Sequence, residues 1–322
     1  MKVSKLRCTR HIACLILTAW TVVSIGSCSV WQDTWERTDA TGVNSDLLVI
    51  PGSGGPEDTF VAFEGAVEYT GEAHEGTDIY YVGTGEMREY IVVIDPGHQA
   101  QGSSAKEPNG PGSDVMKAEV SWGAEGAYSG AEHALNLEVA LLLRDELIAR
   151  GYSVVMIRET AEVNISNMKR AEIANKYNAA AYVRIHANYY DDLTMNGAMT
   201  ICQSPENPYP DCVATYEESR LLSEMVLQTF CKATGMQQLK IREEDDLTGT
   251  NWSKVPTTLV EMGFLSNKSD DMLMATRYFK EQAAEGLADG LDMYFELMMS
   301  RNNIDSSYEA SDEGVNPEEP QG

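Results

Sequence analysis

Histidine is scarce in this chain. The sequence has five histidines among 322 residues, so a site built on histidine has few candidates. Basic residues are also few, since 24 lysines and arginines face 50 aspartates and glutamates, for a formal net charge of −26. Nucleic acids are bound through basic patches, and anionic lipid attracts basic faces, so this balance argues against both partners. Hydrophobic residues nevertheless make up 43% of the chain, so part of it is globular.

The N-terminal apolar stretch, Ile12 to Val23, is shorter than the roughly 20 residues that a membrane-spanning helix needs. It follows a basic segment and precedes Ile25-Gly26-Ser27-Cys28, which is the order found in a secretory signal peptide. The Ile-Gly-Ser-Cys ending resembles a bacterial lipobox, where cleavage precedes a cysteine that then carries lipid. We therefore expect residues 1–27 to be a lipoprotein signal peptide and Cys28 to be lipidated. An ordinary signal peptide cut near Ser27, or an uncleaved anchor, is the alternative.

Cysteines are also few once Cys28 and the expected signal peptide are set aside. Cys202, Cys212 and Cys231 remain, and no Cys-x-x-Cys spacing supports a zinc site made from them. Cys202 and Cys212 bracket a short proline-rich loop, so outside the cytoplasm they form a candidate disulfide worth up to about 3 kcal/mol. Cys231 lies in a helical pattern and is expected to be a small buried hydrophobe.

The chain divides into four regions by composition. After the signal peptide, residues 28–89 are acidic and read as a tether with low structure, although residues 60–63 and 79–82 resemble short β-strands. Residues 90–299 alternate strand and helix patterns, which predicts an α/β domain. Residues 300–322 are polar and acidic, and we expect a disordered tail. No internal repeat is evident.

Three predicted strands of the α/β domain end in side chains that can do chemistry, namely His98, His186 and Glu261. A further carboxylate, Glu132, stands at or near the start of a helix expected over residues 131–150. Because the carboxyl ends of parallel strands meet at one edge of a sheet, we expect these four side chains to converge there.

Two histidines and a carboxylate form a standard catalytic zinc set with one position open for water, and a second carboxylate serves as general base. Each carboxylate has another interpretation. Glu132 stands three residues after Ser129, which is the spacing of a helix capping box, and His133 beside it is an alternative ligand. Glu261 lies between apolar residues, where a carboxylate must be paired, bound to metal or functional.

Four motifs follow one another along the chain, and a helical segment accompanies them: Ile91–His98, Glu132–Leu137, Arg184–Asn188 and Val260–Asn267, together with the helix Met168–Asn175. In this order they resemble the zinc-dependent N-acetylmuramoyl-L-alanine amidases. The resemblance covers about residues 90 to 299, and no single motif is decisive, whereas four in order are specific. The chain departs from the family at Gln99, where a second glycine is frequent, at Arg184, where many relatives have serine, and in a longer loop from Gln99 to Gly130.

The resemblance implies a single catalytic α/β domain, with a mixed, mostly parallel sheet flanked by helices and a zinc site at the C-terminal strand ends. It assigns one Zn²⁺ to His98, Glu132 and His186, and it assigns the acid/base role to Glu261. The implied reaction is hydrolysis of the amide bond between N-acetylmuramic acid and L-alanine in peptidoglycan. Two other functions stay open: another zinc peptidoglycan hydrolase, such as a carboxypeptidase, and a non-catalytic peptidoglycan-binding regulator.

Arg184 and Asn188 are candidates for substrate binding. Arg184 shares a strand face with His186, so its guanidinium is expected to hold a stem-peptide carboxylate or assist the oxyanion, or else to be a partly buried arginine with an acidic partner. Asn188 is expected to orient substrate or to fix the loop after its strand. The expected partners are peptidoglycan and, through lipidated Cys28, the lipid bilayer. The protein is expected to be a monomer on the extracytoplasmic side of the bacterial cell membrane, and part of the 99–130 loop is a candidate cover for the zinc.

Overall fold

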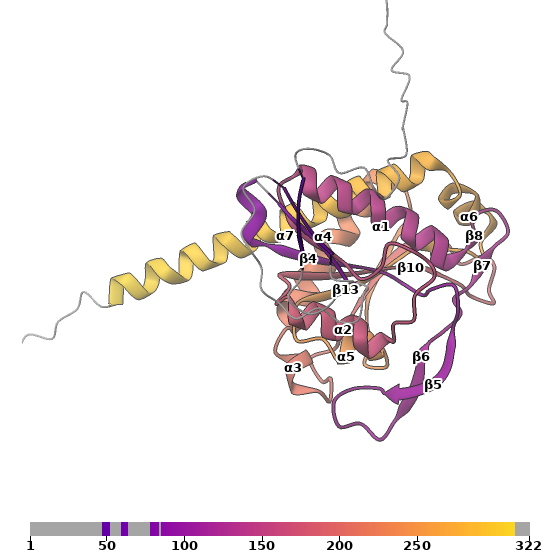
Figure 1. Cartoon of the computed structure of the whole chain (residues 1–322), viewed down its shortest axis with the longest axis horizontal. Helices are drawn as coiled ribbons and strands as arrows, with labels where there is room; N and C mark the ends of the chain where they lie inside the picture. Colours follow the sequence, from indigo (N-terminus) through magenta and orange to yellow (C-terminus); the bar gives the residue numbers. More distant parts are fainter. Residues whose placement is uncertain (1–46, 52–58, 64–77, 84, 313–322) are drawn as a thin grey trace, which may run out of the picture. The chain divides into compact units, whose positions relative to one another are not determined.

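The computed structural model of this protein describes residues 47–51, 59–63, 78–83 and 85–312 (Figure 1). The expected signal peptide, residues 1–27, and Cys28 lie outside the described residues, as do residues 313–322. None of the helices in the described part of the chain is both long and apolar enough to span a membrane.

A nine-stranded sheet forms the centre of the domain, in the order β1-β2-β3-β9-β4-β10-β13-β11-β12. Strands β9, β4, β10 and β13 run parallel to one another, and β11 joins β13 antiparallel. The pairs β2–β3 and β11–β12 are parallel, whereas β1–β2 and β3–β9 are antiparallel. The predicted mixed, mostly parallel sheet is therefore confirmed. The strands are β1 (Leu47–Pro51), β2 (Thr59–Phe63), β3 (Ile79–Val82), β4 (Ile91–Pro96), β9 (Ser153–Met156), β10 (Ala181–Asn188), β11 (Ala198–Cys202), β12 (Gln238–Glu243) and β13 (Thr257–Phe264).

Helices cover both faces of this sheet (Figure 1). The core on one face is closed by α1, α4 and α7, and the core on the other face is closed by α2. Successive strand residues point to opposite faces, so Val92 and Ile94 of β4 enter the first core and Val93 enters the second. Burial on both faces explains why this strand is an unbroken apolar run. The helices are η1 (Glu86–Glu89), α1 (Glu132–Ala149), α2 (Asn167–Lys176), α3 (Pro210–Val213), α4 (Tyr216–Thr234), α5 (Thr248–Asn251), α6 (Lys268–Met274) and α7 (Arg277–Asp312).

The segment 99–130, expected to be a loop, contains a β-hairpin. Strands β5 (Ser103–Pro108) and β6 (Met116–Val120) pair antiparallel, and the short strands β7 (Glu125–Gly126) and β8 (Gly130–Ala131) follow. Side chains from α5 and its flank secure the hairpin tip: Trp252 Nε1 donates to Pro108 O at 2.9 Å, and Asn251 Nδ2 donates to Asn109 O at 3.0 Å. The hairpin lies beside α2 (Figure 1), where the Glu107 carboxylate accepts from Met168 N at 3.1 Å. These bonds give an otherwise polar segment a defined conformation.

Two regions expected to have little structure are ordered in part. Within residues 28–89, β1, β2 and β3 extend the central sheet, because β3 pairs with β9 and buries Tyr80 and Val82. The tail prediction is also wrong for residues 300–312, which belong to α7. That helix is anchored by buried residues such as Leu291 and Phe295, and the sequence offers no proline or glycine after Gly290 to end it before Gly314.

The candidate disulfide is not formed, since Cys202, Cys212 and Cys231 are all free and buried. Cys212 Sγ instead donates to the carbonyl oxygen of Thr250 at 3.4 Å. Burial raises the pKa of Cys202 to about 11 and that of Cys212 to about 12, so both stay protonated and unreactive at neutral pH. Cys231 packs in the core between sheet and helices, as expected.

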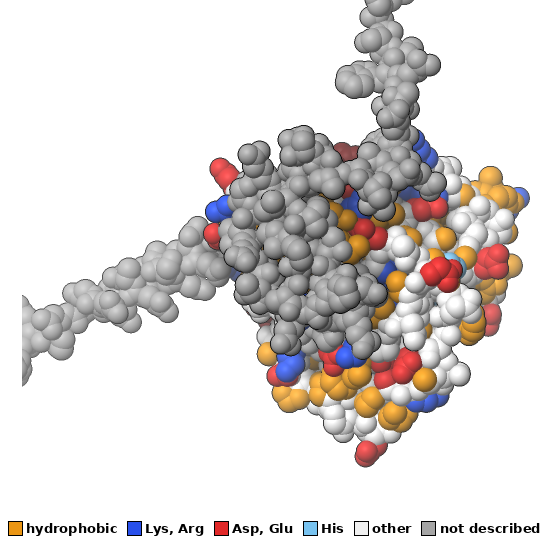
Figure 2. All heavy atoms as spheres, in the orientation of Figure 1, with side chains coloured by type: hydrophobic (Ala, Val, Ile, Leu, Met, Phe, Trp, Pro, Cys, Tyr) orange, Lys and Arg blue, Asp and Glu red, His pale blue; other side chains and the backbone are white. Residues whose placement is uncertain are grey.

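Charged side chains are dispersed on the visible surface. On the face drawn in Figure 2, acidic side chains lie among uncharged and apolar ones, and the lysine and arginine side chains of the described surface stand apart from one another. This distribution agrees with the net charge of −26 and offers no basic stripe for nucleic acid on that face.

Candidate metal centre

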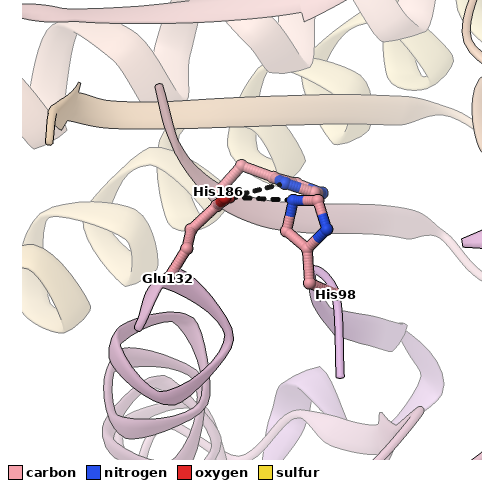
Figure 3. A group of neighbouring side chains, drawn as sticks. All are labelled: His98, Glu132 and His186. Carbon is pink, nitrogen blue, oxygen red and sulfur yellow. Dashed lines mark hydrogen bonds and ion pairs between the residues drawn. The ribbon is translucent and has the colours of Figure 1, made fainter. Parts of the chain in front are cut away.

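Three side chains from distant parts of the chain meet at the carboxyl edge of the sheet (Figure 3). His98 follows β4, Glu132 is the first residue of α1, and His186 lies near the end of β10. Glu132 Oε1 is 3.0 Å from His98 Nε2 and 3.1 Å from His186 Nδ1. One ligand atom from each residue lies within 4.8 Å of the others. The side chains are 5 to 13% exposed, so the cluster is largely shielded from water.

The turn after β4 brings the two histidines together. A Cβ on Gly97 would lie 2.2 Å from the ring of His186, so only glycine fits at this position. His98 itself has φ of 59°, in the left-handed region that non-glycine residues seldom adopt and that costs about 1–3 kcal/mol. Arg170 of α2 holds this conformation by donating from Nη2 to His98 O at 3.0 Å.

A buried ionic cluster around Asp95 stabilises the turn that follows β4. The Asp95 carboxylate accepts from Arg170 Nη1 at 2.5 Å, from Arg184 Nε at 2.9 Å and from the Tyr182 hydroxyl at 2.9 Å. Burial alone would raise the pKa of Asp95, but the two guanidinium groups outweigh it and hold that pKa well below its usual value. Arg184 is thus the buried arginine with an acidic partner that the sequence allowed as an alternative.

The Glu132 carboxylate is fixed by backbone donors as well as by the histidines. Its Oε2 accepts from Ala124 N at 2.8 Å, and its Oε1 accepts from Ala187 N at 3.2 Å. Burial alone would raise the pKa of Glu132, but hydrogen bonds from the two histidine rings outweigh burial and lower it. The helix cap is Ala131, without a side-chain bond, and the Ser129 hydroxyl donates to Asp271. Glu132 is therefore not part of a capping box.

Each histidine presents one nitrogen to Glu132. His98 Nδ1 lies 3.0 Å from Ser121 O, and a carbonyl oxygen only accepts, so a proton held on Nδ1 would leave Nε2, which faces Glu132, free to coordinate a metal ion. Burial lowers the pKa of His186 to about 4, so this ring is neutral at neutral pH. His186 Nε2 is buried and has no hydrogen-bond partner among the described residues. His133 does not belong to the cluster of donor atoms.

Glu261 lies beside the cluster, because β13 pairs with β10 so that Glu261 stands opposite His186. Its Oε2 is buried and has no hydrogen-bond partner in the described part of the chain. Burial, and then the negative charge of Glu132, raises the pKa of Glu261 well above its usual value. Glu261, His98 and His186 line one cavity of about 370 Å³, which Arg184 and Lys117 also border. We call it the catalytic cavity.

Asn188 lies apart from this cavity. Its Oδ1 accepts from Tyr189 N at 2.8 Å, and its carbonyl accepts from Leu265 N at 2.8 Å, so it fixes the loop after β10. It borders a second cavity, on the other side of Glu261 along the sheet.

The three donors fit a zinc ion in chemistry, and the two separations from Glu132 fit it in spacing. Ligands at 2.0–2.1 Å from a tetrahedral zinc stand about 3.3 Å from one another. The 3.0 and 3.1 Å separations between nitrogen and oxygen come close to that value. Two imidazoles, a carboxylate and a nearby buried glutamate, at the carboxyl edge of an α/β sheet, are typical of the class of metal-dependent hydrolases.

Comparisons with known proteins identify the family within this class. Residues 92–293 match the family described as N-acetylmuramoyl-L-alanine amidase, and the chain belongs to that family. It is 26% identical over 204 residues to the N-acetylmuramoyl-L-alanine amidase LytC of Bacillus subtilis (63% of this chain, 35% of the relative). It is 22% identical over 241 residues to AmiC of Neisseria meningitidis (64% of this chain, 53% of the relative). The chain thus spans about half or less of these relatives.

Solved structures of amidases share the fold. The amidase Ami1 of Mycobacterium abscessus superimposes with a TM-score of 0.57 at 26% identity, over 64% of this chain and 98% of that one. An N-acetylmuramoyl-L-alanine amidase of Clostridium difficile 630 gives a TM-score of 0.52 at 27% identity, over 64% of this chain and 97% of that one. The α/β domain of this chain therefore has the fold of amidase catalytic domains.

Proposed function

We propose that this protein hydrolyses the amide between N-acetylmuramic acid and L-alanine in peptidoglycan, with one zinc ion bound by His98, Glu132 and His186. The observation that carries the proposal is the meeting of these three donors beside buried Glu261, which lines one cavity with His98 and His186. Membership of the amidase family and the names of the relatives support the choice of bond.

Zinc at this position would supply a Lewis acid for the scissile carbonyl and lower the pKa of water from 15.7 to about 7. The chain's own contribution begins with Glu132, which is anchored by Ala124 N and Ala187 N and orients both imidazoles. With an ion bound, Ser121 O would accept the proton of His98 Nδ1, so that Nε2 would be free to coordinate. The donors are thus oriented before any ion binds.

Glu261 acts as the general acid and base in this mechanism. A carboxylate oxygen of Glu261 takes a proton from the attacking water and later gives it to the nitrogen of the departing L-alanine. Burial raises the pKa of Glu261 in the chain alone, and a nearby dication acts in the opposite direction.

We place this activity on the extracytoplasmic side of the cell membrane, where the substrate lies. Lipidation of Cys28 after removal of residues 1–27 would keep the enzyme at the membrane surface. The segment between Cys28 and β1 would then set its distance from the membrane, and residues 90–299 would form the catalytic domain.

The experiment combines metal analysis with mass spectrometry of digested cell wall. Glu261→Gln should keep one zinc per chain and lose stem-peptide release by about 10²- to 10⁴-fold, the usual contribution of an acid/base group. His186→Ala should lose the metal. Glu285→Gln, which changes an exposed carboxylate of α7, is the matched control and should behave as wild type.

The products separate this function from its rivals. Intact stem peptide together with unsubstituted glycan identifies the amidase reaction, whereas loss of a C-terminal residue identifies a carboxypeptidase. Absence of any product from wild type, with wall binding retained, would identify a binding protein. Near-normal release by Glu261→Gln, or wild-type zinc affinity in His186→Ala, would overturn the assigned roles.

A further inference from the structure

A second cavity, of about 330 Å³, is bordered by Met199, which stands opposite Glu261 of the catalytic cavity in the neighbouring strand. We call it the β12 cavity, because Lys240 and Arg242 of that edge strand border it. Its remaining walls include the apolar side chains of Met199 and Phe264, which are buried, and of Met195 and Tyr190, which are 37% and 53% exposed. The cavity therefore combines an apolar floor with a cationic side.

Strand register places both cavities on one face of the sheet. His186 of β10 stands opposite Glu261 of β13, and Glu261 stands opposite Met199 of β11. In the neighbouring row, Ile201 of β11 stands opposite Arg242 of β12. Residues that stand opposite each other in neighbouring strands point to the same face of the sheet. His186, Glu261, Met199 and Arg242 therefore lie on one face, which runs from the proposed zinc donors to the basic edge strand β12. A substrate held at Glu261 can therefore extend into the β12 cavity.

Lys240 is an available cation in a strongly acidic protein. No ion pair or hydrogen bond involves its ammonium group within the part of the chain that the structure describes, and Arg242 pairs with Glu244 alone. By contrast, the cations that border the catalytic cavity are already engaged, since Lys117 pairs with Asp246 and Arg184 with Asp95. With a net charge of −26, the protein repels anions in general, so a local cation has a large effect on where an anion binds.

We propose that the β12 cavity binds the carboxylate of the second residue of the stem peptide, through Lys240 and with help from Arg242. The inference rests on the proposed amidase function and adds a specificity site to it. Neighbouring strands are about 4.8 Å apart, so β12 lies about 9.6 Å from β13 and Glu261. Two extended residues span about 7 Å, and the long lysine side chain covers the remaining distance.

The apolar walls strengthen this contact. Met199 and Phe264 are 5% and 1% exposed, so a carboxylate seated above them meets Lys240 in a medium less polar than water, where charge-assisted bonds gain strength. Met195 and Tyr190, at the rim, offer apolar surface to the aliphatic part of the same residue. The second residue is thus recognised by one charge and one apolar contact.

The test uses two synthetic muropeptides, N-acetylmuramoyl dipeptides that carry a free carboxylate or a carboxamide on the second residue. Zinc-loaded wild type should cleave the free acid with at least a 10-fold higher kcat/KM, and the difference should lie in KM. Lys240→Gln with Arg242→Gln should reduce the preference to below about 2-fold, mainly through a higher KM for the free acid. Lys240→Glu should invert the preference, because it replaces attraction by repulsion.

Lys232→Gln, which removes an exposed charge at the end of α4, is the control and should keep the wild-type preference. If wild type cleaves neither substrate, the proposed function fails. If wild type cleaves both equally well, or if the double variant keeps the preference, this inference is overturned while the proposed function stands. If Lys232→Gln loses the preference for the free acid as much as the double variant does, the preference depends on the overall charge of the protein, and the inference is also overturned.

Discussion

Replacing Asp95 by asparagine tests how the domain holds its metal donors in place. The change keeps the size of the side chain but removes the charge that faces Arg170 and Arg184. These guanidinium groups are 0% and 4% exposed, so both would remain buried without a counter-charge. Arg170 also holds the backbone of His98, so the loss is expected to reach the metal donors.

The expected loss of stability is about 3–5 kcal/mol, which is the usual cost of removing one partner from a buried ion pair. For a domain of 150–250 residues, 1 kcal/mol corresponds to about 2–4 °C in Tm. We therefore expect the Tm of Asp95→Asn to fall by about 6–20 °C. Both arginines donate to the same carboxylate. The loss of stability is therefore a property of the three residues together and cannot be obtained by adding the energies of two separate ion pairs.

Urea denaturation of metal-free protein measures this loss, because metal binding to the folded state would otherwise add to the stability of both proteins. Asp145→Asn is the control. Asp145 also pairs with an arginine, Arg144, but is 57% exposed, so its loss should cost less than about 1 kcal/mol. A loss below 1 kcal/mol in Asp95→Asn, or equal losses in the two variants, would refute the reasoning.

Two further outcomes are expected from the same region. Gly97→Ala places a Cβ 2.2 Å from the His186 ring, so chelator competition should show zinc affinity at least 10-fold lower; unchanged affinity would contradict the packing argument. The folded-state pKa of Asp95 is depressed, so its contribution to stability is complete above the unfolded pKa of about 3.9 and is lost as pH falls through the lower, folded pKa. The free energy of unfolding should therefore fall below about pH 4 in wild type, and Asp95→Asn should lack that part of the decline; parallel pH curves for the two proteins would count against it.

The elements with strong local signals were predictable from the sequence. The apolar run before His98 became β4, the helix expected over residues 131–150 became α1, and Ser166 caps α2 by accepting from Lys169 N at 3.3 Å. In each case the pattern of apolar residues, or the capping side chain, lies within the element itself. The candidate site was accessible for the same reason, since its side chains stand where such elements begin or end.

Other features depend on contacts between distant segments. The role of Asp95 follows from Arg170 and Arg184, which are 75 and 89 residues away. Ser121 and Ala124 act on the donors through a backbone carbonyl and a backbone N–H, groups that every residue except proline carries in full, so the sequence gives no sign of them. Strand β12 did leave a signal in alternating Leu239 and Ile241, but a short polar edge strand is easily read as a loop.

The β5–β6 hairpin joins the donors to the far side of the catalytic cavity. Its outgoing end supplies Ser121 O to His98 and Ala124 N to Glu132, while Lys117 on β6 reaches Asp246 at 2.6 Å. If the site binds zinc as proposed, its occupancy and the conformation of the hairpin are linked equilibria. A glycan strand or protein that binds the ordered hairpin would then change the metal affinity by some factor. By thermodynamic reciprocity, bound metal would change the affinity for that glycan strand or protein by the same factor.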